Sequence, residues 1–401
     1  MKYAVILGDG MADWPLDELG GKTPLDAATH PCMDRLARDG SFGLVQTVPD
    51  GMSPGSDTAN LSVFGYDPRK FYSGRSPLEA ASLGILLADT DVTYRCNFVT
   101  LTKERHIEDA TMVDYSAGEI STAEARELIL YLDRALSSEG VRLYPGFSYR
   151  HCFVLNQAET GAILTPPHDF TGKPVAGKLP SGTNAALLQN WMERAYALLG
   201  EHPVNRARIA AGKNPANAIW FWGEGRKPAL TPFFEKTGLH GAVISAVDLI
   251  QGIGRCAGMD VVKVEGATGT YETNFAGKAQ AAIQALSSGA DFVYLHVEAP
   301  DECGHHGQIA EKIYSIEQID AQILGPVWTY LDDCGDDYAI LVLPDHPTPI
   351  HIRTHSAEPV PFSLYKKGDA AGRLLRYTER DAKSTGVVIQ EGYRLIDEMR
   401  K

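Results

Sequence analysis

The sequence predicts an α/β protein with a doubly wound, mostly parallel sheet and an inserted smaller α+β domain. Short, nearly continuous apolar runs alternate with helical patterns at both ends of the chain, which is typical of parallel strands covered on both faces. The middle block, residues 91–214, differs because it lacks the acidic and histidine motifs that follow strands on either side of it. We therefore expect a discontinuous main domain, residues 1–90 and 215–401, interrupted by an inserted domain, 91–214.

The elements of the main domain follow in chain order from these runs. A first strand at 3–7 precedes a helix near 31–39, and a later strand, helix and strand are expected at 242–245, 248–256 and 261–264. The pattern then predicts a strand at 292–297, an amphipathic helix over 310–331 and a strand at 338–343. In the inserted domain we expect a strand at 92–99, helices at 122–137 and 183–199, and a proline-rich loop at 165–180.

Composition and charge exclude several classes of function. The chain has 37 basic and 51 acidic residues, a net charge of −14, which disfavours binding to nucleic acid or to an anionic membrane. Its apolar runs are strand-sized, and the first one begins without a signal peptide, so we expect a cytoplasmic protein. The six cysteines form no C-x-x-C pair, which argues against a zinc ribbon or a redox dithiol. No residue pattern indicates an oligomeric state.

Three of the expected strands end in residue types that bind metals. Ligands in open α/β sheets bind beyond the carboxyl ends of the strands. The candidates at these ends are Asp9, Asp301, His305, Asp345, His346 and, nine residues after His346, His355. Six oxygen and nitrogen ligands without a thiolate suit two borderline divalent cations such as Mn²⁺ or Zn²⁺.

Each of these motifs has a plain structural alternative. Asp9-Gly10 alone is usually a turn, and Asp301 with His305 alone indicates a metal no better than evenly. Their joint occurrence at successive strand ends makes a binuclear metal site the better interpretation.

Ser56 is the candidate nucleophile. It follows a glycine and leads into what the sequence predicts to be the first turn of a helix, so it could simply cap that helix. Alternatively, its Oγ lies where free backbone N–H groups and the positive helix end favour a phosphoryl group, and a cation would lower the hydroxyl pKa. Together with the metal-ligand set, the second interpretation is favoured.

These motifs resemble the cofactor-independent phosphoglycerate mutases, in their shorter archaeal-type branch of the alkaline phosphatase superfamily. The resemblance spans essentially the whole chain. The motifs that carry it include Gly8-Asp9-Gly10, Gly55-Ser56-Asp57-Thr58-Ala59-Asn60, Ser73-Gly74-Arg75, Tyr149-Arg150-His151, Pro167-His168-Asp169, Pro300-Asp301, Asp345-His346 and His355-Ser356.

The resemblance implies an alkaline phosphatase-like fold and an isomerase of glycolysis. One metal would be held by Asp9, Ser56, Asp345 and His346, and the other by Asp301, His305 and His355. Ser56 would take the phosphoryl group from 3-phosphoglycerate and return it to the 2-hydroxyl of the retained glycerate. A phosphoserine intermediate of this kind requires no bisphosphoglycerate.

The inserted domain would close over this intermediate and bind the small phosphorylated substrate. An anionic substrate needs cationic partners in an otherwise acidic chain. The candidates in the matching motifs are Arg75, Arg150, His151, His168 and Lys173. Asp169 could bind a glycerate hydroxyl or orient His168, and Arg226 is a further candidate cation in the segment that departs from the family pattern. For each of them, a solvated or salt-bridged surface position is the alternative.

Trp220 and Trp222 depart from the archaeal pattern, which has an aliphatic run at this place. The variant is similar to a bacterial subgroup proposed to act as homoserine kinase, so a homoserine kinase-like phosphotransferase using the same site is the alternative function. A simple phosphatase and a non-catalytic binding protein are further alternatives. Both tryptophans could also be core residues.

Overall fold

The computed structural model describes all residues from 1 to 401. The chain forms two compact units: the first consists of Met1–Tyr72 and Ala229–Lys401, and the second is Ser73–Pro228. The second unit is therefore longer at both ends than the expected insert, 91–214.

The extra segments belong to the second unit because they pack on its central strand, β3 (Val92–Leu101). At one end, α5 (Ser76–Ser82) is tied to β3 by the Ser76 hydroxyl, which donates to Thr93 O at 3.0 Å. At the other end, β9 (Ala218–Arg226) pairs with β3 in antiparallel fashion. The amino-acid pattern of these two segments does not indicate their contacts with β3.

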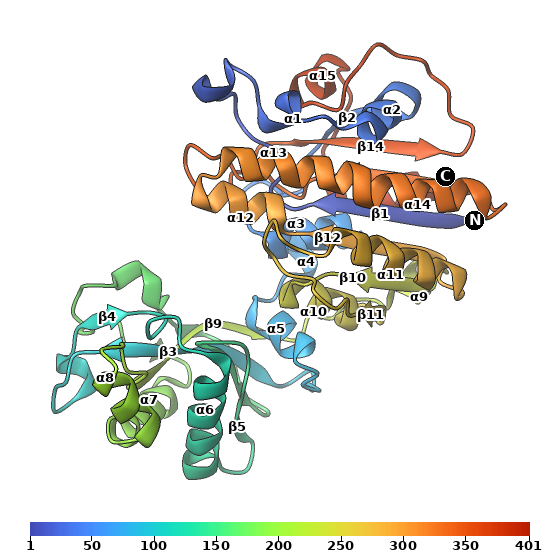
Figure 1. The fold of residues 1–401 in the computed structure, drawn as a ribbon. Helices are drawn as coiled ribbons and strands as arrows, with labels where there is room; N and C mark the ends of the chain where they lie inside the picture. The colour runs from blue at the N-terminus through green and yellow to red at the C-terminus, as the bar shows by residue number, and fades with distance from the viewer. The chain divides into compact units, whose positions relative to one another are not determined.

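The first unit is built on an eight-stranded sheet, of which β14, β1, β12, β10 and β11 are labelled in Figure 1. Its strand order is β11-β10-β12-β1-β13-β14-β2-β15. The five strands from β11 to β13 are mutually parallel. Their bounds are β1 Lys2–Gly8, β10 Gly241–Ile244, β11 Asp260–Val262, β12 Phe292–Val297 and β13 Tyr338–Leu343. This is the mostly parallel α/β sheet that the apolar runs predict.

The other edge of this sheet is antiparallel and was not anticipated. β14 (Val360–Lys366) runs antiparallel to both β13 and β2 (Ser41–Val45), while the short β15 (Val388–Ile389) runs parallel to β2. Of these three strands only β14 is buried along nearly its whole length, and its partner β2 lies near the other end of the sequence.

Helices cover both faces of the sheet, as a doubly wound fold requires. One face carries Ile6, Leu295 and Ile340 into the main hydrophobic core, together with residues of α2, α11 and α14. On the other face, the ring of Tyr294 stacks on Phe64 next to α3, with centroids 3.9 Å apart. The helices of this unit are α1 Pro24–Ala27, α2 Pro31–Asp39, α3 Ser56–Val63, α4 Pro68–Phe71, α9 Phe233–Thr237, α10 Asp248–Cys256, α11 Phe275–Ser287, α12 Ala299–His306, α13 Ile309–Gln318, α14 Gly325–Asp333, α15 Glu379–Ser384 and α16 Leu395–Arg400.

The helix expected over 310–331 is continuous but irregular. A π-helical segment, Ile319–Leu324, separates α13 from α14. Within it, the Asp320 carboxylate accepts hydrogen bonds from the backbone N–H groups of Cys32 and Met33 at 3.1 and 2.7 Å. These two N–H groups open α2 and have no partner inside that helix, so Asp320 supplies one.

The second unit is an α+β domain, as expected for the insert. Its sheet has the order β4-β3-β6-β5, and β9 also pairs with β3. Every pair in this sheet is antiparallel. Phe153 and Phe221 pack with Trp191 of α7 to fill its core. The remaining elements are β4 Met112–Asp114, β5 Val141–Tyr144, β6 Arg150–Leu155, β7 Ala162–Ile163, β8 Ser181–Gly182, α6 Thr122–Leu136, α7 Ala185–Leu199 and α8 Pro203–Ala210.

None of the helices combines the length and the apolar character that crossing a membrane would require.

Candidate metal centre and active site

The carboxyl ends of three adjacent strands bring the expected metal ligands together. Because β12, β1 and β13 are neighbours, Asp9 after β1 lies between Asp345 after β13 and Asp301 in the first turn of α12. The ligand atoms of two groups each lie within 4.8 Å of one another. The groups are Asp9, Asp345 and His346, and Asp301, His346 and His355. His346 belongs to both, so the two groups form one continuous centre.

Four potential ligand atoms gather in the first group. His346 Nε2 lies 3.1 Å from Ser56 Oγ, 3.4 Å from Asp9 Oδ1 and 3.4 Å from Asp345 Oδ2. These are the four residues that the family resemblance assigns to one metal.

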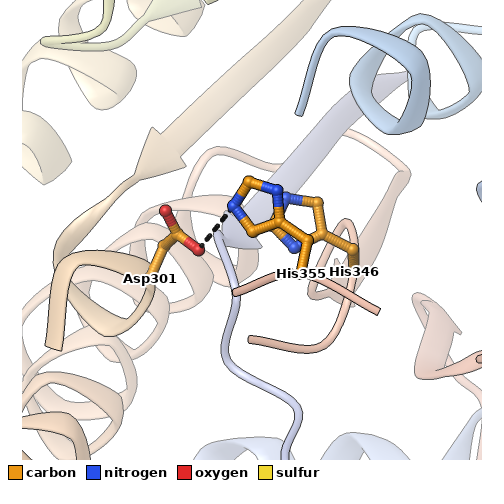
Figure 2. Close-up of side chains that lie close together, drawn as sticks. All are labelled: Asp301, His346 and His355. Atoms are coloured by element: carbon orange, nitrogen blue, oxygen red, sulfur yellow. Dashed lines mark ion pairs between the residues drawn. The ribbon is translucent and has the colours of Figure 1, made fainter. Parts of the chain in front are cut away.

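The second group places Asp301 among histidines (Figure 2), with His355 Nε2 3.4 Å from Asp301 Oδ1. His305, which the sequence also predicts, joins it: its Nε2 lies 3.2 Å from Asp301 Oδ2 and 3.0 Å from His355 Nε2. His305 Nδ1 lies 3.0 Å from Arg353 O, which can only accept, so this nitrogen carries the proton in the neutral ring. His305 Nε2 faces Asp301 and His355: it donates to Asp301 while the ring is protonated, and it is the nitrogen that would bind a metal once that proton is lost.

The electrostatics of this centre fit bound cations. Burial, with Asp345 and Asp301 nearby, raises the pKa of Asp9 well above its usual value. Asp9 Oδ1 is moreover a buried oxygen with no hydrogen-bond partner. A buried, unpaired carboxylate oxygen facing other carboxylates is costly without a counter-charge. The donor set of carboxylate oxygens and imidazole nitrogens fits two divalent cations.

The Asp301 side of the centre is shaped by its histidines. Burial opposes ionisation of Asp301, yet hydrogen bonds from His305 and His355 hold its pKa well below the usual value. The same hydrogen bond to Asp301 raises the pKa of His305 to about 9. Burial lowers the pKa of His346, which keeps its imidazole neutral.

Ser56 does not cap the helix that it begins. The N-cap of α3 is Gly55, and Ser56 is the first helical residue. Its hydroxyl is directed to His346 instead of to the backbone of its own helix. The capping interpretation of Ser56 is therefore wrong, and its role as the nucleophile stays a prediction.

Sequence reasoning missed three residues that hold the ligands. Asn60 donates from Nδ2 to Asp345 Oδ2 at 2.8 Å, and the Thr348 hydroxyl donates to Asp301 Oδ1. His296 Nε2 lies 2.9 Å from Asp9 Oδ2. Asn60 was visible as the last residue of the Ser56 motif, whereas His296 lies within the buried strand β12 and carries no local signal.

In the second unit, part of the expected cationic set is clustered. Arg75 Nε and Arg95 Nε lie 2.8 and 2.9 Å from the two oxygens of Glu79. Burial lowers the pKa of Arg95 to about 10, with contributions from the positive charges of Arg75 and Arg150 nearby. Two guanidinium groups thus contact the Glu79 carboxylate, and the positive charge of Arg150 acts on it as well. Arg95 was not among the predicted residues, because it lies in the middle of β3.

Aromatic rings adjoin this cluster. The Arg95 guanidinium lies 4.0 Å from the ring centre of Trp222, and His168 meets the same ring edge-on at 5.2 Å. His168 Nε2 also lies 3.5 Å from the carboxylate of Asp169. Trp222 is therefore a platform for Arg95, whereas Trp220 is a fully buried core residue.

Other expected residues do not join the cluster. His151 is buried on the opposite face from Arg150, because consecutive strand residues alternate, and its ring packs on Phe98. Burial lowers the pKa of His151 to about 3. Arg226 donates to Ala158 O and pairs with Glu159. Lys173 is exposed.

A family model and two relatives that match over nearly the whole chain carry the same description. Residues 37–205 match a family model described as 2,3-bisphosphoglycerate-independent phosphoglycerate mutase. A protein of Geobacter sulfurreducens, named a probable mutase of this kind, is 51% identical over 401 residues, covering 100% of this chain and 99% of its own. The mutase of Methanothrix thermoacetophila is 51% identical over 396 residues, covering 99% of this chain and 98% of its own.

Two solved structures share the fold over the full length. A protein from Pyrococcus horikoshii is 31% identical with a TM-score of 0.82, and the match covers 99% of this chain and 96% of that one. A cofactor-independent phosphoglycerate mutase from Thermoplasma acidophilum is 27% identical with a TM-score of 0.70, covering 100% and 99%. The chain therefore belongs to the family of 2,3-bisphosphoglycerate-independent phosphoglycerate mutases.

Proposed function

We propose that this protein interconverts 3-phosphoglycerate and 2-phosphoglycerate without 2,3-bisphosphoglycerate, using Ser56 as the nucleophile at a binuclear metal site. The observation that carries the proposal is the position of Ser56 Oγ, 3.1 Å from His346 Nε2 among the carboxylates of the first group. A hydroxyl directed to that place is poised for phosphoryl transfer.

Two divalent cations, Mn²⁺ or Zn²⁺, fit the residues present. Asp9, Ser56, Asp345 and His346 would hold one, and Asp301, His305 and His355 the other. When bound, the cations supply positive charge that lowers the pKa of the Ser56 hydroxyl and stabilises charge on the transferring phosphoryl group.

The chain's own residues then perform two displacements. Ser56 Oγ forms a bond to phosphorus as the bond from phosphorus to the 3-oxygen of glycerate breaks, and the serine proton ends on that oxygen. The 2-hydroxyl of the retained glycerate next attacks the phosphoserine, its proton returns to Ser56, and 2-phosphoglycerate forms. The position of Ser56 at the start of α3 favours the phosphoryl group, because helix N-termini attract anions.

The second unit supplies the cations for the substrate's carboxylate. Arg75 and Arg150, with Arg95 beside them, carry more positive charge than Glu79 neutralises. Arginine suits bidentate capture of carboxylates. Binding roles for His151, His168, Asp169, Lys173 and Arg226, a cytoplasmic location and the lack of a nucleic-acid partner remain predictions.

The alternative of a homoserine kinase is not favoured. Relatives that match over 91–100% of the chain at 51–52% identity carry the mutase name. Trp222, whose presence suggested that alternative, has a structural role as the platform for Arg95.

Phosphorus NMR of the metal-loaded protein with 3-phosphoglycerate tests the proposal. We expect 2-phosphoglycerate to appear without free phosphate, and Ser56→Ala to lower turnover by at least ~10³-fold, because losing a nucleophile removes the covalent path. Ser53→Ala, an exposed serine three residues earlier, is the matched control and should turn over normally. Ordinary activity of Ser56→Ala would refute the covalent mechanism, and phosphate release without isomerisation would indicate a phosphatase.

A further inference from the structure

Strand β12 carries two polar side chains toward the metal centre, although neither is a metal ligand. Tyr294 and His296 are two residues apart, so they project from the same face of the strand, and both are fully buried. The alternate residues Val293, Leu295 and Val297 belong to the hydrophobic core on the other face. A fully buried tyrosine and histidine side by side on a central strand require hydrogen-bond partners.

The partner of His296 is Asp9. A carboxylate that binds a metal is ionised and can only accept, so His296 Nε2, 2.9 Å from Asp9 Oδ2, must carry the ring's proton. The other nitrogen, Nδ1, is then an acceptor and receives the Ser245 hydroxyl at 3.2 Å. Ser245 Oγ itself accepts from Val247 N at 3.0 Å, which leaves its hydrogen free to point at the ring. The tautomer of His296 is thereby fixed.

The partner of Tyr294 is Asn60. The tyrosine hydroxyl donates to Asn60 Oδ1 at 2.6 Å, so the amide must turn its Nδ2 the other way. Both Nδ2 hydrogens are then used, one on Asp345 Oδ2 and one on Ser56 O, each at 2.8 Å. Flipping the amide would direct its oxygen at two acceptors, which the Tyr294 hydroxyl prevents.

These hydrogen bonds leave specific oxygens for a cation. On Asp9, His296 occupies Oδ2, and Oδ1 is buried without a partner, 3.4 Å from His346 Nε2. On Asp345, the backbone N–H groups of Gly10 and His346 occupy Oδ1 at 3.1 and 2.9 Å. Oδ2, held by one Asn60 hydrogen, keeps a lone pair facing His346.

We infer that Tyr294 and His296 are positioning residues for the Asp9, Asp345 and His346 group. His296 acts on Asp9 directly, and Tyr294 acts on Asp345 through Asn60. In this way β12 determines which carboxylate oxygen of Asp9 and of Asp345 is presented to the metal. The Asp301, His305 and His355 group receives no hydrogen bond from either residue, and its partners are Thr348 and Arg353 O. The inference rests on the proposed metal-dependent function and concerns only one of the two metal positions.

The test is a calorimetric titration of metal-free protein with Mn²⁺ alone, which reports two dissociation constants without reference to catalysis. His296→Phe should weaken one of them by roughly 10–100-fold and leave the other within about 2-fold, because loss of a hydrogen bond to a ligand typically costs that much affinity. His296→Gln, whose amide can donate from nearly the same place, should restore most of the affinity. Tyr294→Phe should weaken the same constant.

The control for Tyr294→Phe is Tyr377→Phe, since Tyr377 is another fully buried tyrosine of the first unit, whose hydroxyl donates to Pro361 O at 3.0 Å. It should leave both constants unchanged. If His296→Phe does not fold, His296→Gln and Tyr294→Phe still decide, because the first should resemble wild type and the second should not.

The possible outcomes separate this inference from the proposed function. Wild-type constants in both Tyr294→Phe and His296→Phe, or an equal loss at both metals, would overturn the positioning role while leaving the binuclear site intact. If wild-type protein binds no Mn²⁺, the proposed metal site fails and the inference fails with it.

Discussion

Replacing Lys312 by Met should destabilise the first unit more than any change to a surface charge. Lys312 Nζ lies 2.7 Å from Asp13 Oδ2, and neither side chain is exposed to solvent. The ammonium also donates to Thr348 O at 2.8 Å. Lys312 thus joins α13 to the chain segments that follow β1 and β13, which are the segments carrying Asp9 and Asp345.

The expected cost follows from the burial of both charges. Methionine fills a similar volume, but it leaves the Asp13 carboxylate with only the backbone N–H groups of Trp14 and Ile350. Removing one partner of a buried ion pair costs about 3–5 kcal/mol. For a unit of this size, that corresponds to a fall in melting temperature of roughly 10 °C.

The measurement is urea and thermal unfolding of metal-free protein, followed by circular dichroism. Lys401→Met is the control, because its partner Glu398 lies 2.6 Å away in an exposed pair, and such pairs contribute at most about 1 kcal/mol. The double variant Lys312→Met with Asp13→Leu should regain most of the loss, since it leaves no unpaired charge. A loss below about 1 kcal/mol in Lys312→Met alone would refute the reasoning.

Three further outcomes are expected. Burial raises the pKa of Glu379 to about 7 from an ordinary 4.5, so the stability that its protonated form contributes is complete below pH 4.5 and is lost as pH rises through 7. Urea unfolding at pH 5 and pH 7.5 should show this decline in the wild type and not in Glu379→Gln, and an unchanged decline in the variant would contradict the assignment. Gly10 has a φ of +60°, and a Cβ there would lie 2.7 Å from Asp301 Cα, so Gly10→Ala should lower both the Mn²⁺ affinity and the melting temperature. Gly20 has a φ of +66° and open space around it, so Gly20→Ala should show only the cost of backbone strain. Equal effects of the two variants would show that the close approach of Gly10 to Asp301 does not matter. Removing bound metal with a chelator should abolish turnover and lower the melting temperature. Mn²⁺ at 100 times its dissociation constant should then raise the free energy of unfolding by about 2.7 kcal/mol. A melting temperature insensitive to Mn²⁺ would count against the metal site.

The sequence was sufficient to predict the parallel part of the sheet and the clustering of candidate ligands at its strand ends. Buried parallel strands are continuous apolar runs, and β12 and α10 were placed with their observed bounds. Asp9, Asp301 and Asp345 could be grouped because adjacent parallel strands end on the same edge.

The remaining features depend on contacts that no local pattern encodes. The edge strand β2 is only five residues long and begins with an exposed serine, so its pairing with β14 shows only in three dimensions. His296 and Arg95 are polar residues within strands, where an apolar run predicts core side chains. Their roles come from the charged partners that meet them across the fold, Asp9 and Glu79.

The order of the central strands also determines when the metal centre can form during synthesis. β1 pairs only with β12 and β13, and Val5 lies opposite Tyr294 and Leu341. The first strand therefore cannot form its sheet hydrogen bonds until most of the chain has been synthesised. Ser73–Pro228, by contrast, is one continuous stretch whose strands pair only with one another. We therefore expect the second unit to fold during synthesis before Asp9 has its partners, and any metal binding at this centre would follow the synthesis of His355.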